Sequence, residues 1–398
     1  MIPDTFRLRP VLLAGLLAAA SPYQAFALEA QEVADRFKAL MALQQIELSY
    51  SAANLAGGDV TLEGVTVKPT GGEQSFDLGQ IVLQDVTEAQ DGSFRVGTLE
   101  MDAFEHSQND ITVSMTDLSI EGLVLPDDPA SDPFGGAMRY DRMELARVNV
   151  EGKDGPLASA TNLYADVAVG DDNTMAMDGA IESFSLNLAS LVEDAEGANT
   201  LDEMGYSELG GKAVMEASWQ PSDGRLTVSR YEMAVDDAGT LNMTMDLAGY
   251  TPAFIKSLDE TMKAMEQQPE GSENQSMQGM AMLGLMQQLT LHGVTIRFAD
   301  DSLTGKVLEQ VAEKQGSTPA DLISLAKAAI PQQLSPFVGA ELAASISQAV
   351  GTFLENPQNI EVSVKPANPL PFAMLAAAAM TSPEALVKQL GLAVTANQ

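Results

Sequence analysis

Two histidines, His106 and His292, are the side chains of this sequence best suited to acid–base or metal chemistry. We expect His106 to lie in a polar turn, EHSQND, and His292 to lie in the middle of the strand unit TLHGVTI. The related stretches TLEGVTV and SIEGLVL carry a glutamate where TLHGVTI carries His292, which indicates a solvent-facing position. A triad or a two-histidine metal site would need the two side chains to meet. We therefore expect two surface histidines and no catalytic residue.

A group of methionines offers a second kind of chemistry, because thioethers are soft ligands for Cu(I). Four of them fall within ten residues, and two more lie just upstream: Met277, Met280, Met282, Met286, Met262 and Met265. On a helix, however, Met277 and Met280 share a face that only partly overlaps the face of Met282 and Met286. Methionine also fills irregular apolar surfaces. We expect these residues to line a core or a groove and to bind no metal.

Other motifs of cofactor chemistry are missing from the sequence. GYSELGGKA (205–213) contains glycines and a lysine, but their spacing does not match that of a phosphate-binding loop. We expect it to be a plain turn. The Asp-rich turns lack the spacing of a calcium loop with its distal glutamate. GxSxG, HExxH and GxGxxG do not occur, and the single Trp argues against a sugar-stacking cleft. We predict no cofactor, although an enzyme of unrecognised type stays open as the third alternative.

The first residues are typical of an export signal. Arg7 and Arg9 precede an apolar run at 11–20, and small residues occupy the first and last positions of 25–27. This pattern predicts a signal peptide over 1–27 that is cleaved after Ala27, with the mature chain in the periplasm. The apolar run is shorter than the ~20 residues that a membrane-spanning helix needs. No later apolar segment reaches that length, so we expect no transmembrane segment in the mature chain.

Composition and charge exclude several further classes of protein. The chain has 21 basic and 56 acidic residues, and its net charge of −35 repels nucleic acid and anionic headgroups. Without any cysteine, disulfides and thiolate metal sites are ruled out, and stability must come from buried apolar surface. A hydrophobic content of 45% argues against disorder. The oligomeric state does not follow from these properties.

One short pattern, apolar-x-apolar-x-x-apolar-x-apolar, recurs along the chain. Its six copies are Val60/Leu62/Val65/Val67, Phe94/Val96/Leu99/Met101, Leu118/Ile120/Leu123/Leu125, Met143/Leu145/Val148/Val150, Leu226/Val228/Tyr231/Met233 and Leu289/Leu291/Val294/Ile296. A helix would scatter these side chains around its axis, whereas a strand places each pair on one face and breaks parity in the middle. Two structures break parity in this way: a two-residue hairpin and a β-bulge.

The positions of the turn signals favour bulges over hairpins. The central residue pairs of the six copies are poor type I′ turns, while better turn signals lie between the copies, at 90–93, 125–133, 152–155, 170–173, 220–224 and 236–239. We therefore predict long bulged strands, with Gly64, Gly122 and Gly293 at the bends of a curved sheet.

Helical patterns occupy the beginning and the last third of the chain. Spacing and capping signals predict helices over 29–46, 251–268, 277–288, 302–316, from 318 onward, over 340–357 and from 381 to 391, with a polar linker at 269–276. The predicted class is α+β: an N-terminal helix, a long curved antiparallel β-sheet with bulged strands, and a helix-rich C-terminal part. The expected domains are 28–250 and 251–398, with strands near 289–298 and 359–365 joining the sheet.

The export signal, the first helix and strand units such as VTLEGVTV and DITVSMTDLSIEGLVLP resemble the AsmA-like and YdgA-like envelope proteins of Gram-negative bacteria. The resemblance covers residues 28–300, contains no diagnostic motif and transfers no functional residue. It implies an elongated curved sheet and a role in outer-membrane maintenance or lipid movement. Most AsmA-like proteins keep a membrane anchor, whereas this chain is expected to lose its signal. The stretch KPANPLPFAML is similar to uncharacterised alphaproteobacterial secreted proteins.

These observations leave three functional alternatives. The first is a periplasmic, non-enzymatic protein whose sheet forms an apolar groove for a lipid or an envelope partner. The second is a scaffold whose sheet is fully covered by its own helices, and the third is an unrecognised enzyme. If a groove exists, one parity class of the strand units and the Met-rich helix should line it: Leu62, Ile120, Leu291, Met280, Leu283 and Met286.

Overall fold

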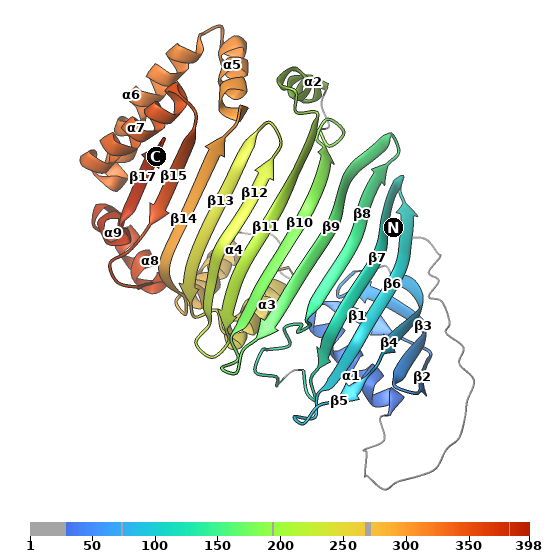
Figure 1. Ribbon diagram of the computed structural model, residues 1–398. Helices are drawn as coiled ribbons and strands as arrows, with labels where there is room; N and C mark the ends of the chain where they lie inside the picture. Colours follow the sequence, from blue (N-terminus) through green and yellow to red (C-terminus); the bar gives the residue numbers. More distant parts are fainter. Residues whose placement is uncertain (1–28, 73–74, 130, 193–194, 267–271, 382) are drawn as a thin grey trace, which may run out of the picture. The chain divides into compact units, whose positions relative to one another are not determined.

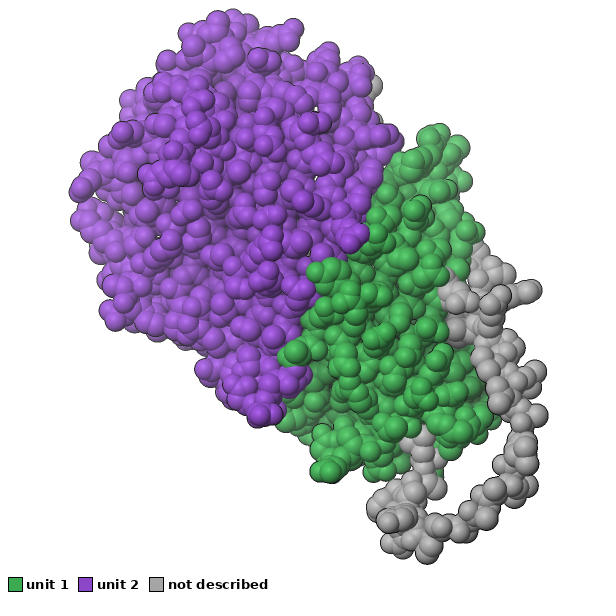
Figure 2. All heavy atoms as spheres, viewed as in Figure 1, with its two compact units in different colours: residues 1–168 green, residues 169–398 purple. Residues whose placement is uncertain are grey.

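The computed structural model describes residues 29–72, 75–129, 131–192, 195–266, 272–381 and 383–398 (Figure 1). The signal peptide predicted for 1–27 lies outside the described residues. The chain forms two compact units, residues 1–168 and residues 169–398 (Figure 2). The predicted domains meet near 250, between the end of a strand at Ala248 and the start of a helix at Pro252. That division stays a prediction.

Unit 1 combines one helix with antiparallel strands. Strand β3 pairs with β1, β2 and β4, and the strands from β6 onward form successive antiparallel hairpins. Its elements are α1 (Ala30–Leu43), β1 (Ile46–Ser49), β2 (Ala52–Ala56), β3 (Asp59–Pro69), β4 (Phe76–Gln84), β5 (Thr87–Glu88), β6 (Phe94–Gln108), β7 (Ile111–Leu125), β8 (Arg142–Gly152) and β9 (Gly155–Val169).

Unit 2 begins with strands and continues with helices. Its strands are β10 (Met175–Asn187), β11 (Glu208–Gln220), β12 (Arg225–Val235), β13 (Gly239–Ala248), β14 (Thr290–Asp300), β15 (Asn359–Val364), β16 (Leu370–Pro371) and β17 (Leu392–Ala396). Its helices are α2 (Ala195–Met204), α3 (Pro252–Glu266), α4 (Ser272–Met286), α5 (Leu303–Gln315), α6 (Pro319–Val338), α7 (Ala340–Glu355), α8 (Phe372–Thr381) and α9 (Pro383–Leu390). The predicted α+β class is confirmed.

The copies in β3, β6, β7, β8 and β12 each lie within one strand, and the sixth begins at Leu289, one residue before β14, so no copy contains a hairpin. A bulge between the two apolar pairs is confirmed in β3, β12 and β14, whereas the copies in β6, β7 and β8 keep one register across their centres. In β12 the register shifts between Val228 and Tyr231. In β14 it shifts at His292, between Leu291 and Gly293. Strict alternation would point Arg230 to the face that Val228 occupies. The bulge inserts one extra residue, so that the apolar residues on both sides of it share a face.

Glycine permits two of the predicted bends. Gly64 in β3 has φ +57°, and Gly122 in β7 has φ +67°, a region that L side chains rarely adopt. A side chain at Gly122 would also collide with the ion pair between Arg95 and Asp141. Gly293 has no such positive φ, although the bulge of β14 lies next to it.

The core of unit 1 lies between α1 and the inner face of its sheet. Four helix residues, Val33, Ala34, Phe37 and Leu40, are buried at the spacing that the sequence pattern predicts. They pack in one cluster with buried residues of β3, β4, β6 and β7. Helix α1 thus covers this part of the sheet.

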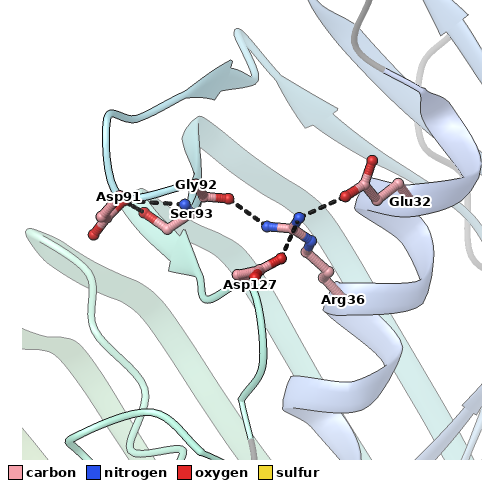
Figure 3. A network of polar contacts seen from close by, with 6 residues as sticks. All are labelled: Glu32, Arg36, Asp91, Gly92, Ser93 and Asp127. Carbon is pink, nitrogen blue, oxygen red and sulfur yellow. Dashed lines mark hydrogen bonds and ion pairs between the residues drawn. The ribbon is translucent and has the colours of Figure 1, made fainter. Parts of the chain in front are cut away.

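Arg36 fastens the polar side of α1 to the neighbouring loops (Figure 3). Its guanidinium donates to the carbonyl of Gly92 at 2.5 Å, pairs with Glu32 and Asp127 at 2.5 and 2.7 Å, and lies over the Phe94 ring at 4.3 Å. The Gly92 carbonyl is presented by a turn in which the Asp91 carboxylate accepts bonds from Ser93. Those bonds lower the pKa of Asp91.

Replacing Arg36 by methionine is expected to lower the free energy of unfolding by about 1–3 kcal/mol. Methionine keeps the apolar stem but leaves the Gly92 carbonyl without its donor. Urea denaturation followed by circular dichroism measures the change. Lys38→Met on the exposed side of α1 is the matched control, with an expected change within about 0.5 kcal/mol. Equal stability of the two variants would show that Arg36 does not anchor the helix.

Tyr50 links the end of β1 to the start of α1. Its phenol donates to Asp35 at 2.7 Å and accepts from Gln31 at 2.7 Å. Burial, and then the hydrogen bond to the Asp35 carboxylate, raise the pKa of Tyr50 to about 12. A raised pKa in the folded state stabilises the fold below the ordinary pKa of about 10. That contribution is lost as the pH rises towards 12.

Alkaline titration of absorbance at 295 nm is therefore expected to show a late-ionising tyrosine. The Tyr50→Phe variant should lack this component, and Asp35→Asn should move it to lower pH because the accepting charge is gone. An unchanged late component in Tyr50→Phe would contradict the assignment.

Several elements differ from the sequence predictions. Helix α4 begins at Ser272, inside the linker predicted for 269–276. Helix α2, helix α8 and strand β17 were not predicted at all. The capping signal at Thr318 is confirmed: its side chain accepts from the Asp321 N–H, and Asp321 accepts from the Thr318 N–H.

Candidate functional site

The strands of unit 2 line up side chains into rows that cross the sheet. Antiparallel partners stand opposite each other on the same face, so a chain of partners from strand to strand forms a ladder. Tyr231 of β12, for example, stands between Met215 of β11 and Met243 of β13. Met243 in turn stands opposite Ile296 of β14.

Four successive ladders make one face of this sheet apolar. The first contains Met175, Trp219, Leu226, Leu247, Leu291 and Leu370; the second contains Met177, Ala217, Val228, Met245, Val294, Val364 and Leu392; the third contains Gly179, Met215, Tyr231, Met243, Ile296, Val362 and Val394; the fourth contains Ile181, Ala213, Met233, Leu241, Phe298, Ile360 and Ala396. We call this surface the apolar face. In each strand every second residue points to this face. The bulges of β12 and β14 shift the alternation by one residue, so that the apolar residues on both sides of each bulge lie on this same face.

The residues between those of the ladders make the opposite face polar. Glu232, Asn242, Arg297 and Glu361 form one of its rows. The sheet of unit 2 is thus amphipathic across its width, as expected when one face meets apolar material and the other meets water.

The first ladder is covered at the end of the sheet where α3 begins. Trp219 is buried, and its indole N–H donates to the Tyr250 carbonyl at 2.8 Å. The Tyr250 ring lies 5.6 Å from the ring of Phe254, which is also buried. The chain from Tyr250 into α3 therefore closes this end of the apolar face.

The fourth ladder is in contact with α7. The Phe353 ring meets Phe298 edge to face at 6.4 Å, and Phe353 is buried. Asn397 strengthens this contact because its side-chain amide donates to the carbonyls of Thr352 and Asn356 at the end of α7.

The third ladder, between these covered ends, is open to solvent. Met215, Ile296 and Val362 expose 42, 43 and 40% of their surface. Neighbouring side chains in a sheet already bury part of each residue. Exposed fractions of this size therefore indicate that no helix or loop of the described residues covers these three side chains. We call the stretch of the third ladder from Met215 to Val362 the open ladder. Contiguous exposed apolar surface of this kind is typical of binding sites.

The six residues predicted to line a groove do not form one group. Leu62 and Ile120 belong to the buried core of unit 1 beneath α1. Leu291 belongs to the covered first ladder of unit 2. On α4, Met280 and Leu283 are exposed at 67 and 51%, and Met286 is partly buried. A groove role for these six stays a prediction.

The prediction of two surface histidines was wrong for His106. It is not in a turn but in β6, where it is 5% exposed and meets the Phe76 ring at 5.4 Å. It shares its row with Val113 and Val150, so it stands on an apolar surface of unit 1. The polar residues around it in the sequence do not indicate a strand, because its apolar surroundings come from the neighbouring strands β7 and β8.

His292 is partly buried at the bulge of β14. Its Nε2 lies 3.1 Å from the guanidinium of Arg225, which also pairs with Asp246 at 2.5 Å. The guanidinium thus lies between the imidazole and the carboxylate and contacts both.

No group of three or more His, Cys, Asp or Glu side chains suited to a metal ion occurs within the described ranges. Over the same ranges, no helix combines the length and the apolar character required to cross a membrane.

Comparison with known proteins adds little to this picture. A family model described only as "Uncharacterized protein" matches residues 232–397. This region contains only the last residues of β12, 232–235, and all of β13, β14, β15 and β17. Strands β13, β14 and β15 supply Met243, Ile296 and Val362 of the open ladder. No curated protein matches the chain.

Proposed function

We propose that this protein is an exported, non-enzymatic protein that binds the acyl chain of a lipid on the open ladder of unit 2. The observation that carries the proposal is the exposure of apolar side chains in the middle of a sheet face whose two ends are covered. Leaving these side chains in water costs free energy, and an acyl chain laid across them would remove that cost at about 25 cal/mol per Å² of buried apolar area.

The chemistry of the surface favours an apolar chain over a polar ligand. The open ladder presents thioether, aliphatic and aromatic groups, among them Met215, Met243 and Tyr231. Flexible methionine side chains adapt to ligands of varied shape. The net charge of −35 disfavours nucleic acid and the surface of an anionic membrane, so a single lipid molecule suits the protein better than a bilayer.

The two alternatives have less support. A scaffold with a fully covered sheet agrees with the part of unit 1 that α1 covers, but not with the exposed Ile296 and Val362 of unit 2. An enzyme would need a proton-transfer or nucleophilic group in a cleft, and His292 is held by Arg225 instead. The periplasmic location and the relation to AsmA-like and YdgA-like envelope proteins are part of this proposal and rest on the sequence pattern alone.

Native mass spectrometry of the protein purified from a periplasmic fraction, followed by lipid extraction, tests the proposal. We expect a near-stoichiometric adduct whose mass matches an acyl lipid, and its loss after delipidation. Incubation with oleate should restore an adduct of the corresponding mass. A clean apo mass that persists after incubation with oleate would contradict the proposal and favour a scaffold that binds an envelope protein.

A further inference from the structure

A cavity of about 430 Å³ lies beside β17, at the margin of unit 2. Five consecutive residues, 391–395, line it, together with the start of α7 and one side of α9. Consecutive residues of a strand point to opposite faces, so a cavity that touches all of them borders the edge of the strand and not one of its faces. Its volume lies within the range of typical ligand sites.

The backbone of this edge is available for hydrogen bonding. Within the described part of the chain, all five residues of β17 pair with β15, and no residue pairing joins β17 to another strand. The Asn397 N–H donates to the Asn359 carbonyl at 2.8 Å, so residue 397 faces β15. Backbone groups alternate in an antiparallel pair. Ala393 and Thr395 therefore also face β15, whereas the N–H and C=O groups of Leu392 and Val394 point to the free edge.

The walls of the cavity combine apolar and acidic groups. Leu342 of α7 and Val387 of α9 supply apolar surface, and Glu341, Glu384 and Lys388 supply charge. Lys388 is already paired with Glu384 at 3.1 Å. The net charge of the three is −1, which favours one cationic group on an occupant.

We infer that this cavity is a strand-addition site, which binds an extended peptide segment of a partner protein along the free edge of β17. An edge strand next to a lined cavity offers two things: main-chain hydrogen bonds for affinity and a pocket for alternate side chains. The segment that fits carries small apolar side chains at alternate positions, to contact Leu342 and Val387, and a Lys or Arg that reaches Glu341. This site lies at the free edge of β17, where Val394 ends the third ladder next to Val362, and it does not depend on the acyl-chain proposal.

The inference is tested with a phage-displayed library of random heptapeptides selected on the purified protein. The enriched peptide is then synthesised in three forms: unmodified, N-methylated at its odd amides and N-methylated at its even amides. Strand addition uses the amides of one parity only. We expect one methylated form to bind at least tenfold more weakly than the unmodified peptide and the other to bind within threefold. Equal binding of both methylated forms would overturn the inference, as would the absence of any enriched peptide.

A variant of the protein provides the complementary test. Val394→Pro removes an N–H that the β15 pairing does not use, which an edge strand tolerates. We expect at least a tenfold loss of affinity for the enriched peptide. Amide hydrogen exchange on the wild-type protein needs no variant: added peptide should slow exchange at Val394 at least tenfold and leave Thr395 little changed. Unchanged exchange at Val394 in the presence of saturating peptide would overturn the inference.

Discussion

Replacing Ile296 by glutamate is expected to weaken binding of a fluorescent fatty acid at least tenfold, which is about 1.4 kcal/mol. Ile296 stands at the centre of the open ladder, between Met243 and Val362. A carboxylate there would have to lose its hydration when an acyl chain covers it, and that loss has a high free-energy cost. Because Ile296 is already 43% exposed, we expect the free energy of unfolding to change by no more than about 1 kcal/mol.

Thr295→Glu is the matched control for this prediction. Thr295 is the neighbour of Ile296 in β14, but its side chain lies on the polar face opposite Thr244 and Ser363. The two variants have the same charge and differ in the face that carries it. Fluorescence titration should show near wild-type affinity for Thr295→Glu. Equal loss of affinity in both variants would mean that net charge, and not the apolar face, governs binding.

The second large effect is expected from Leu62→Asp in unit 1. Leu62 has no exposed surface and packs in the core beneath α1. The substitution removes a buried leucine and places a carboxyl group in an apolar site, and each change costs about 2–5 kcal/mol. Because folded domains are stable by only about 5–15 kcal/mol, we expect unit 1 to lose its cooperative fold at 37 °C. Circular dichroism and limited proteolysis report this loss.

The neighbouring residue provides the comparison for Leu62. Thr61 pairs with Val82 on the other face of β3 and is only partly buried. Thr61→Asp should therefore cost no more than about 1 kcal/mol. A cooperative unfolding transition for Leu62→Asp at the wild-type temperature would contradict the assignment of Leu62 to the core.

Local sequence patterns predicted much of this fold because the spacing of apolar residues within a strand shows which residues share a face and where the alternation breaks. The pairs Leu226/Val228 and Tyr231/Met233 predicted a break in alternation, and the structure places a bulge between them. Turn signals such as 236–239 marked the ends of strands correctly because their glycine and aspartate residues favour turns wherever they occur.

Features that depend on distant partners could not be predicted in the same way. His106 is flanked by polar residues in sequence, yet Val113 and Val150 on adjacent strands place it in an apolar row. Strand β17 has a sequence compatible with several structures, and its pairing with β15 decides the outcome.

The candidate site was predictable in kind but not in place. Parity alone indicated an apolar sheet face that included Leu62, Ile120 and Leu291. Which part of such a face stays open depends on where the helices lie: α1 covers Leu62, and the chain from Tyr250 into α3 closes the end of the first ladder. Ile296 and Val362 stay exposed because none of the described helices covers them. Their exposure could not be predicted from the residues around them in the sequence.

Photo-crosslinking with a diazirine-labelled stearate tests the central claim most directly. The protein is irradiated with the bound probe, digested, and the labelled peptides are mapped by mass spectrometry. We expect adducts on peptides from several strands, centred on Met215, Tyr231, Met243, Ile296 and Val362, and competition by unlabelled oleate. Adducts confined to the helices, or labelling that oleate does not reduce, would contradict the claim that the open ladder binds an acyl chain.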